Sequence, residues 1–153
     1  MALLTRKLKH KCLVKVRTFS SAKVRCMHDH VKPTIRDVNL VHIILHCGTN
    51  DLNSERAASQ IARSIIELAL SLKSKDNKIS ISLIVPRNDN LNSKASEVNC
   101  RLVHMCAERN IPYIDHTNSI QPENHLNESK LHFNMYGTIT FANSISKFLS
   151  KYY

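Results

Sequence analysis

Residues 41–51 (VHIILHCGTND) join an almost continuously apolar run to a short polar loop. A run of this length, rich in Ile, Leu and Val, predicts a parallel β-strand buried on both faces. His42 and His46 alternate on one face of this strand, so we expect both rings to be packed and hydrogen-bonded. Gly48 allows a sharp turn at a position where a side chain would clash. The stretch therefore predicts a strand that runs into a functional loop of an α/β domain.

The rest of the chain alternates between short β-branched runs and longer segments with helical periodicity. Strands are predicted at residues 13–19, 78–85 and 111–115, and helices at residues 22–35 (limited by Pro33), 54–73, 95–109 and 134–149. This alternation predicts a parallel sheet with helices on both faces, a three-layer α/β domain. Loops at the carboxyl ends of such strands form the reactive edge, here residues 48–51, 87–90 and 115–118. Arg87 either faces this edge, where it could bind an anionic group, or is a loop residue without a functional role.

The positive charge of the chain lies in its first quarter. The 153 residues carry 22 Lys and Arg against 12 Asp and Glu, and residues 1–36 hold ten of these bases with Asp29 as their one acid. We therefore divide the chain into a basic segment, residues 1–12, and one domain, residues 13–153. A basic segment can bind nucleic acid by releasing counterions from the phosphates, or it can be an ordinary solvated face.

The sequence also indicates where the protein is located in the cell, and it argues against a metal site. No apolar run reaches the roughly 18 residues that span a bilayer, and the N-terminus lacks the apolar core of a signal peptide. We therefore expect an intracellular, cytoplasmic protein without membrane contact, whose five cysteines are free thiols. Cys47, at the end of an apolar strand, is expected to be structural. Cys26, His28 and His30 lack a second ligand pair at metal-site spacing, so no metal is expected.

Two short patterns point to chemistry. In Gly48-Thr49-Asn50-Asp51, the Asn50 amide could donate a hydrogen bond to a developing oxyanion. In Leu131-His132-Phe133-Asn134, the imidazole of His132 lies where a loop enters a helix and could act as a general base. Each pattern alone also suits an ordinary turn or helix cap, but their order and their placement on an α/β layout make the combination more specific.

Together these patterns resemble the SGNH/GDSL hydrolase (esterase) family over about residues 13–150. The resemblance is greatest to esterase-like domains of invertebrate genomes that occur near retroelements. It implies a flavodoxin-like three-layer sheet and cleavage of carboxylic esters through a serine acyl-enzyme, without metal or organic cofactor. It also implies that Asn50, after the Gly48 turn, is the oxyanion donor and that His132 is the general base.

The chain departs from this family at three blocks. It has no Gly-Asp-Ser nucleophile block, Ser20 and Ser21 stand where the second block has its glycine, and Ser129 replaces the aspartate three residues before His132. Asp115, at a strand end, is a candidate acid to orient His132. The departures predict a domain that binds a small ester or acyl-type ligand but is catalytically impaired.

Two alternatives stay open. One is an active esterase whose missing block is supplied by a longer chain or another subunit, and the other is a nucleic-acid-associated module that uses the basic segment. The missing block also predicts that the first, central strand of the sheet is absent. The sheet would then be rearranged, completed by a strand from a partner, or part of a longer protein.

Overall fold

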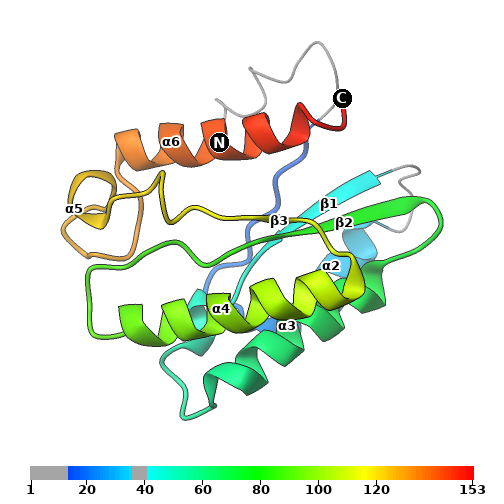
Figure 1. The fold of residues 1–153 in the computed structure, drawn as a ribbon, viewed down its shortest axis with the longest axis horizontal. Helices are drawn as coiled ribbons and strands as arrows, with labels where there is room; N and C mark the ends of the chain where they lie inside the picture. Colours follow the sequence, from blue (N-terminus) through cyan, green and yellow to red (C-terminus); the bar gives the residue numbers. More distant parts are fainter. Residues whose placement is uncertain (1–13, 36–40) are drawn as a thin grey trace.

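The computed structural model describes residues 14–35 and 41–153. Helices and strands alternate along these residues, as the sequence predicts (Figure 1). In chain order they are α2 (Val24–Ile35), β1 (Val41–His46), the 3-10 turn η1 (Thr49–Asp51), α3 (Ala58–Leu72), β2 (Asn77–Ser82), α4 (Asn92–Arg109), β3 (Tyr113–Ile114), α5 (Pro122–His125) and α6 (Met135–Leu149). The basic segment, residues 1–12, lies outside the described residues.

The three described strands form one parallel sheet in the order β1-β2-β3. β1 and β2 are in register from Val41 opposite Asn77 to His46 opposite Ser82. β3 pairs only through Tyr113 and Ile114. Parallel neighbours need crossover connections, and α3 and α4 provide them. The carboxyl ends of all three strands therefore meet at one edge, which α5 and the start of α6 also approach (Figure 1).

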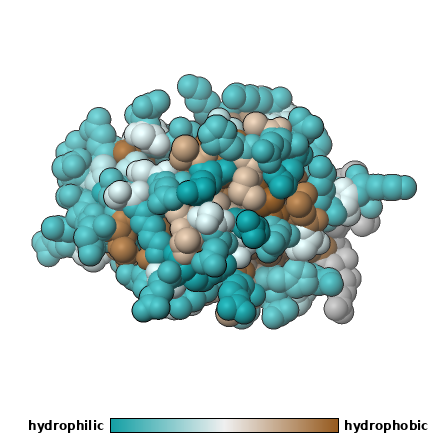
Figure 2. Space-filling view, turned by 60° about the horizontal axis from the view of Figure 1, so that its bottom comes forward, coloured by the Kyte–Doolittle hydropathy of each residue, from teal (hydrophilic) through white to brown (hydrophobic). Residues whose placement is uncertain are grey.

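Helices cover both faces of this sheet, which confirms the predicted three-layer class. On one face, Ile43, Leu45, Ile79 and Ile81 join a core with residues of α2, α3 and α4. α6 packs on the opposite face, against Ile114 and Ile44. The outer surface around α3 and α4 is mostly hydrophilic, with apolar side chains visible between the polar ones (Figure 2).

The predicted helices are largely confirmed because their apolar stripes find a core. In α3 the predicted stripe of Ile61, Ile65, Leu68 and Leu72 is buried. Pro33 lies in the last turn of α2 and does not prevent the helix from reaching Ile35. α4 ends at Arg109, and the next residue, Asn110, adopts the left-handed conformation favoured after a helix.

The strand predicted at residues 13–19 is wrong for its described part. Residues 14–19 are irregular, although Val14 and Val16 pack inward beside Ile44 and Lys15 and Arg17 point outward. The alternation of apolar and polar residues therefore predicted correctly which side chains of residues 14–19 face the core. It could not supply a ladder, because an extended segment becomes a strand only when a neighbour pairs with its backbone.

β1 is likewise less buried than predicted. Its backbone pairs only with β2 among the described residues, so it is an edge strand rather than a central one. His46 is exposed, and residues 42–44 are only half-buried. This arrangement agrees with a sheet that lacks its first central strand.

No helix in the described part of the chain is long and apolar enough to cross a membrane. Cys26, Cys47, Cys100 and Cys106 are free thiols, as predicted, and Cys12 lies outside the described residues.

Candidate functional site

The loop after β1 turns at Gly48 as predicted. Gly48 has a φ of 107°, a value that side-chain-bearing residues rarely adopt. A Cβ atom there would lie 2.9 Å from Ile65 Cδ1 and 3.2 Å from Ile84 Cδ1. Both the backbone conformation and the packing therefore require glycine, and the turn directs η1 toward the carboxyl edge of the sheet.

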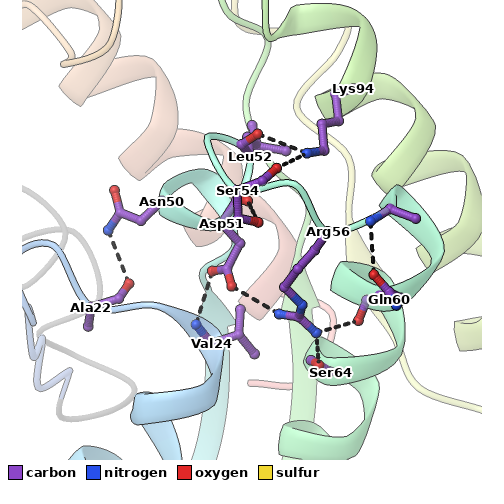
Figure 3. A network of polar contacts seen from close by, with 11 residues as sticks. Ala22, Val24, Asn50, Asp51, Leu52, Ser54, Arg56, Gln60, Ser64 and Lys94 are labelled. Atoms are coloured by element: carbon purple, nitrogen blue, oxygen red, sulfur yellow. Dashed lines mark hydrogen bonds and ion pairs between the residues drawn. The ribbon is translucent and has the colours of Figure 1, made fainter.

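Asn50 is the second residue of η1 and is half-buried. Its Nδ2 donates a hydrogen bond of 3.1 Å to the carbonyl oxygen of Ala22, in the segment before α2 (Figure 3). An amide nitrogen carries two hydrogens, so this bond fixes the side chain and leaves a second N–H as a candidate donor to a ligand.

Asp51 anchors the same loop from below. Its carboxylate is 1% exposed, and it accepts hydrogen bonds from the Val24 backbone N–H (3.0 Å) and from Arg56 Nη1 (3.2 Å) (Figure 3). Arg56 in turn donates to the Gln60 carbonyl and to Ser64 Oγ on α3. The sequence did not lead us to assign this role to Asp51. The basic residue Arg56, five positions later, could have suggested that Asp51 is the acid of an ion pair.

Asp51→Ala is expected to lower the free energy of unfolding by about 2 kcal/mol, because the buried Val24 N–H loses its acceptor and Arg56 loses its counter-charge. Urea denaturation followed by circular dichroism measures this loss. Asp51→Asn, which keeps one acceptor oxygen, should lose less. Asp76→Ala, which removes an exposed carboxylate, is the matched control and should change stability by no more than about 0.5 kcal/mol. Equal effects of Asp51→Ala and Asp76→Ala would contradict the anchoring role.

The segment that resembles the second family block lies beside this loop. Ser21 adopts a φ of 59°, in the left-handed region that normally favours glycine. The turn around it is closed by a hydrogen bond from Ala22 N–H to the Phe19 carbonyl (3.2 Å). A serine therefore accepts the torsions of this position, and the Asn50–Ala22 bond holds the turn next to the oxyanion candidate.

Arg87, at the carboxyl end of β2, reaches the same loop. Its side chain is almost fully buried, and Nη1 donates to Thr49 Oγ1 at 2.8 Å. Nε and Nη2 of the guanidinium bind the Asp89 carboxylate, and these bonds lower the pKa of Asp89 below its usual range. Arg87 thus faces the candidate edge, with its charge already paired.

An open depression of about 530 Å³ adjoins Arg87. It lies between the loop after β2 and the loop after β3, and most of its lining residues have polar side chains, including Asn92, Thr117, Gln121 and Glu123. It provides space for a small ligand at the edge where the strand ends converge.

His132 is placed at this edge by the segment before α6. Its side chain is exposed, and its backbone carbonyl accepts a hydrogen bond of 2.8 Å from Asn127 N–H. Ser129, at the family's aspartate position, hydrogen-bonds Asn127 Oδ1. Among the described residues, the structure records no hydrogen bond from the His132 ring to Asn50 or to an acid. The role of His132 as a base stays a prediction.

Asp115 forms a local turn. Its Oδ1 accepts hydrogen bonds from Thr117 N–H (2.8 Å) and Thr117 Oγ1 (2.6 Å). This carboxylate is exposed, and its proposed orientation of His132 also stays a prediction.

Asn134 and Gly137 fix the start of α6 next to His132. Asn134 Oδ1 accepts a hydrogen bond from Gly137 N–H at 2.9 Å, and Asn134 Nδ2 donates to the Asn124 carbonyl at 2.8 Å. Asn134 thus caps the helix and ties it to α5. Because the first turn of α6 is locked in this way, the backbone of the adjoining His132 segment is also positioned.

A series of hydrogen-bonded histidine and serine side chains, of which Ser82 and His116 are buried, crosses the face of the sheet that α6 covers. His46 Nδ1 lies 2.9 Å from Ser82 Oγ, and Ser82 Oγ lies 2.7 Å from His116 Nε2. Burial, together with the His46 imidazole, lowers the pKa of His116 to about 4 against the opposite effect of Asp115. Burial of the imidazole by surrounding protein atoms also lowers the pKa of His46, to about 4, although the residue as a whole is exposed.

Cys47 offers no nucleophile at the candidate edge. Burial of its sulfur, and then the charge of Asp51, raise the pKa of the Cys47 thiol to about 12. The reactive species of cysteine is the thiolate, so this half-buried thiol is structural, as predicted. Across residues 14–35 and 41–153, no three His, Cys, Asp or Glu side chains gather in a way that could hold a metal ion.

This architecture is similar to that of several solved lipolytic proteins and esterases. No protein-family model and no curated protein sequence matches the chain. The structure is similar to the aryl esterase of M. smegmatis, with a TM-score of 0.83 and 12% identity over 97% of this chain and 83% of that one. It is similar to a carbohydrate acetylesterase from Sinorhizobium meliloti, with a TM-score of 0.80 and 12% identity over 99% and 84% of the two chains.

A member of the lipolytic G-D-S-L family from Veillonella parvula has 23% identity and a TM-score of 0.73 over 84% of this chain and 75% of its own. Identities this low establish the fold and not the activity. The chain therefore has the three-layer α/β fold of the solved G-D-S-L lipolytic proteins and esterases.

Proposed function

We propose that this chain is an SGNH-type esterase-like domain that binds small ester or acyl-type ligands and is impaired in hydrolysis. The observation that carries the proposal is the loop after β1, where the Gly48 turn presents Asn50 and where Asn50 and Asp51 fasten residues 22 and 24 to it. An amide donor held in place at the carboxyl edge of the sheet suits the carbonyl oxygen of an ester.

The absent nucleophile limits what this site can do. Removal of a triad member from a serine hydrolase costs on the order of 10⁴–10⁶ in rate, and the sequence contains no Gly-Asp-Ser. Ser129, in place of the aspartate, also removes the family's own acid from this position, so that orientation of His132 would depend on Asp115. Asn50 and His132 would then act as binding groups for a ligand that they cannot cleave.

Apolar side chains beside His132 indicate which part of a ligand they would contact. Met135 and Tyr136, the first residues of α6, are 75% and 72% exposed. Large apolar side chains so exposed at the start of α6, close in sequence to His132, suit an aryl or alkyl group attached to the ester. Two solved structures similar to this one are named as an aryl esterase and a carbohydrate acetylesterase, which supports our proposal of small aryl or alkyl esters as the ligand class.

Titration of the ¹⁵N-labelled chain with phenyl acetate tests the proposal. We expect the Asn50 side-chain amide and the His132 ring signals to shift as the ester binds, and Asn50→Ala to abolish the shift at His132. Asn77→Ala, at the opposite end of the sheet, is the control and should leave binding unchanged. If neither Asn50 nor His132 responds to saturating ester, the proposal is wrong.

An active serine esterase is a second candidate, favoured by the open side of β1. Within the described residues β1 pairs only with β2, and His46 at its carboxyl end is exposed. A strand carrying the nucleophile, from another subunit or from a longer chain, could pair along this side. Assignment to the retroelement-associated branch and nucleic-acid binding by residues 1–12 remain further proposals, which the described structure does not address.

A further inference from the structure

The histidine and serine chain between the sheet and α6 connects four elements. It runs from His46 on β1 to Ser82 on β2, then to His116 after β3, and ends at Ser144 on α6. The three links are 2.9 Å, 2.7 Å and 3.1 Å long, the last joining Ser144 Oγ to His116 Nδ1. All three distances are those of good hydrogen bonds.

The number of hydrogens available to these four side chains limits which tautomers the two imidazoles can adopt. The Ser82 hydroxyl has one hydrogen and lies between two imidazole nitrogens, so in the neutral protein it donates to one ring and accepts from the other. If Ser82 donates to His116 Nε2, both His46 and His116 carry their hydrogen on Nδ1. If Ser82 donates to His46 Nδ1, both rings carry it on Nε2. The two histidines therefore share one tautomer.

We propose that a proton relay is formed by His46, Ser82, His116 and Ser144. The relay holds both imidazoles in the same tautomer, and each protein molecule takes up one proton at the exposed His46. The added proton binds Nε2 of His46, whose Nδ1–H then donates to Ser82. Ser82 must donate to His116 Nε2, and His116 Nδ1–H must donate to Ser144. Protonation thus selects one of the two directions in which the hydrogen bonds of the relay can run. On α6, Ser144 then accepts the hydrogen bond from His116.

The surroundings of the relay support uptake of a single proton. Ser82 and His116 are each 1% exposed, so His46 is its solvent-facing end. Phe141 of α6 packs against both rings, with centroid distances of 4.9 Å to His46 and 4.8 Å to His116. The titratable groups that act on His116 are His46 and Asp115. A second proton would place two cations on either side of one hydroxyl, so the pair titrates as a coupled unit.

The adjacent histidine on β1 provides a matched control. His42 Nε2 lies 2.8 Å from Ser80 Oγ, on the same two strands and on the same face of the sheet. The described structure links Ser80 to no second imidazole, and it gives the buried His42 Nδ1 no partner. Ser80→Ala therefore removes an equivalent hydroxyl without interrupting the relay.

Long-range ¹H–¹⁵N spectra of the imidazoles in the full chain, recorded from pH 7.5 to pH 4, test the proposal. We expect His46 and His116 in the same tautomer at pH 7.5 and a shared titration midpoint. In Ser82→Ala, His46 should titrate independently of His116, with its midpoint lowered, because its imidazolium loses the Ser82 hydroxyl that accepts the Nδ1–H. Ser80→Ala should leave both rings as in the wild type.

Opposite tautomers in the wild type would overturn the relay without any variant. So would a Ser82→Ala protein whose two rings titrate as they did before. If Ser82→Ala does not fold, Ser144→Ala tests the far end: it should keep the shared titration midpoint while changing the ¹⁵N shift of His116 Nδ1, and an unchanged Nδ1 shift would contradict the proposal.

Discussion

Gly137→Ala is expected to lower the free energy of unfolding by at least about 3 kcal/mol. A Cβ atom at Gly137 would lie 2.0 Å from the His125 carbonyl oxygen and 2.9 Å from Phe133 Cδ1. The first contact is with backbone, so α5 or the first turn of α6 must move to relieve it. This movement would also pull the Asn134 cap from the helix. The loss should therefore exceed the gain of about 1 kcal/mol that alanine normally brings to a helix.

Urea denaturation of Gly137→Ala and wild type measures this effect. Thr140→Ala, one turn further along α6, is the matched control, because it places alanine in the same helix without a backbone clash. Its free energy of unfolding should stay within about 1 kcal/mol of wild type. A Gly137→Ala protein as stable as Thr140→Ala would show that α5 does not pack on α6 as described.

Stability should fall by about 3 kcal/mol as the pH is lowered from 7.5 to 4, through His116 alone. The ordinary pKa of histidine is 6.5, and that of His116 in the folded protein is about 4. Between these values the unfolded chain binds a proton that the folded chain excludes, so lower pH favours unfolding. The full contribution is present above pH 6.5 and is lost progressively toward pH 4.

Free energies of unfolding at pH 7.5, 6, 5 and 4 measure this loss, and His116→Gln is the comparison that removes the titrating ring. The variant should be less stable at pH 7.5 but should lose less stability toward pH 4 than wild type. Asp89, whose pKa is lowered by Arg87, acts only below this window. If wild type and His116→Gln lose the same amount between pH 7.5 and 4, His116 is not held neutral by burial.

The sequence predicted the elements whose cause is local. The stripe of Ile61, Ile65, Leu68 and Leu72 predicts α3, and the apolar run before Gly48 predicts β1. It failed at residues 14–19, because pairing depends on a neighbour elsewhere in the chain. For the same reason β1 was predicted to be buried on both faces, whereas the described sheet leaves it half-buried at an edge.

The candidate site was predictable only in part. Gly48 and Asn50 were identified because a turn and an amide after a strand have local meaning. The anchoring of Asp51 to Val24 and the link from Arg87 to Thr49 join residues 27 and 38 positions apart in the chain, which periodicity does not reveal. His116 was missed for a similar reason, since its partners come from β1, β2 and α6.

Hydrolysis of p-nitrophenyl acetate by the purified chain tests the central proposal most directly. We expect wild type and His132→Ala to show the same slow rate, because a site without a nucleophile cannot form an acyl-enzyme even with Asn50 in place. Wild-type hydrolysis well above buffer that His132→Ala abolishes, while His104→Ala retains it, would contradict an impaired domain and establish an active esterase.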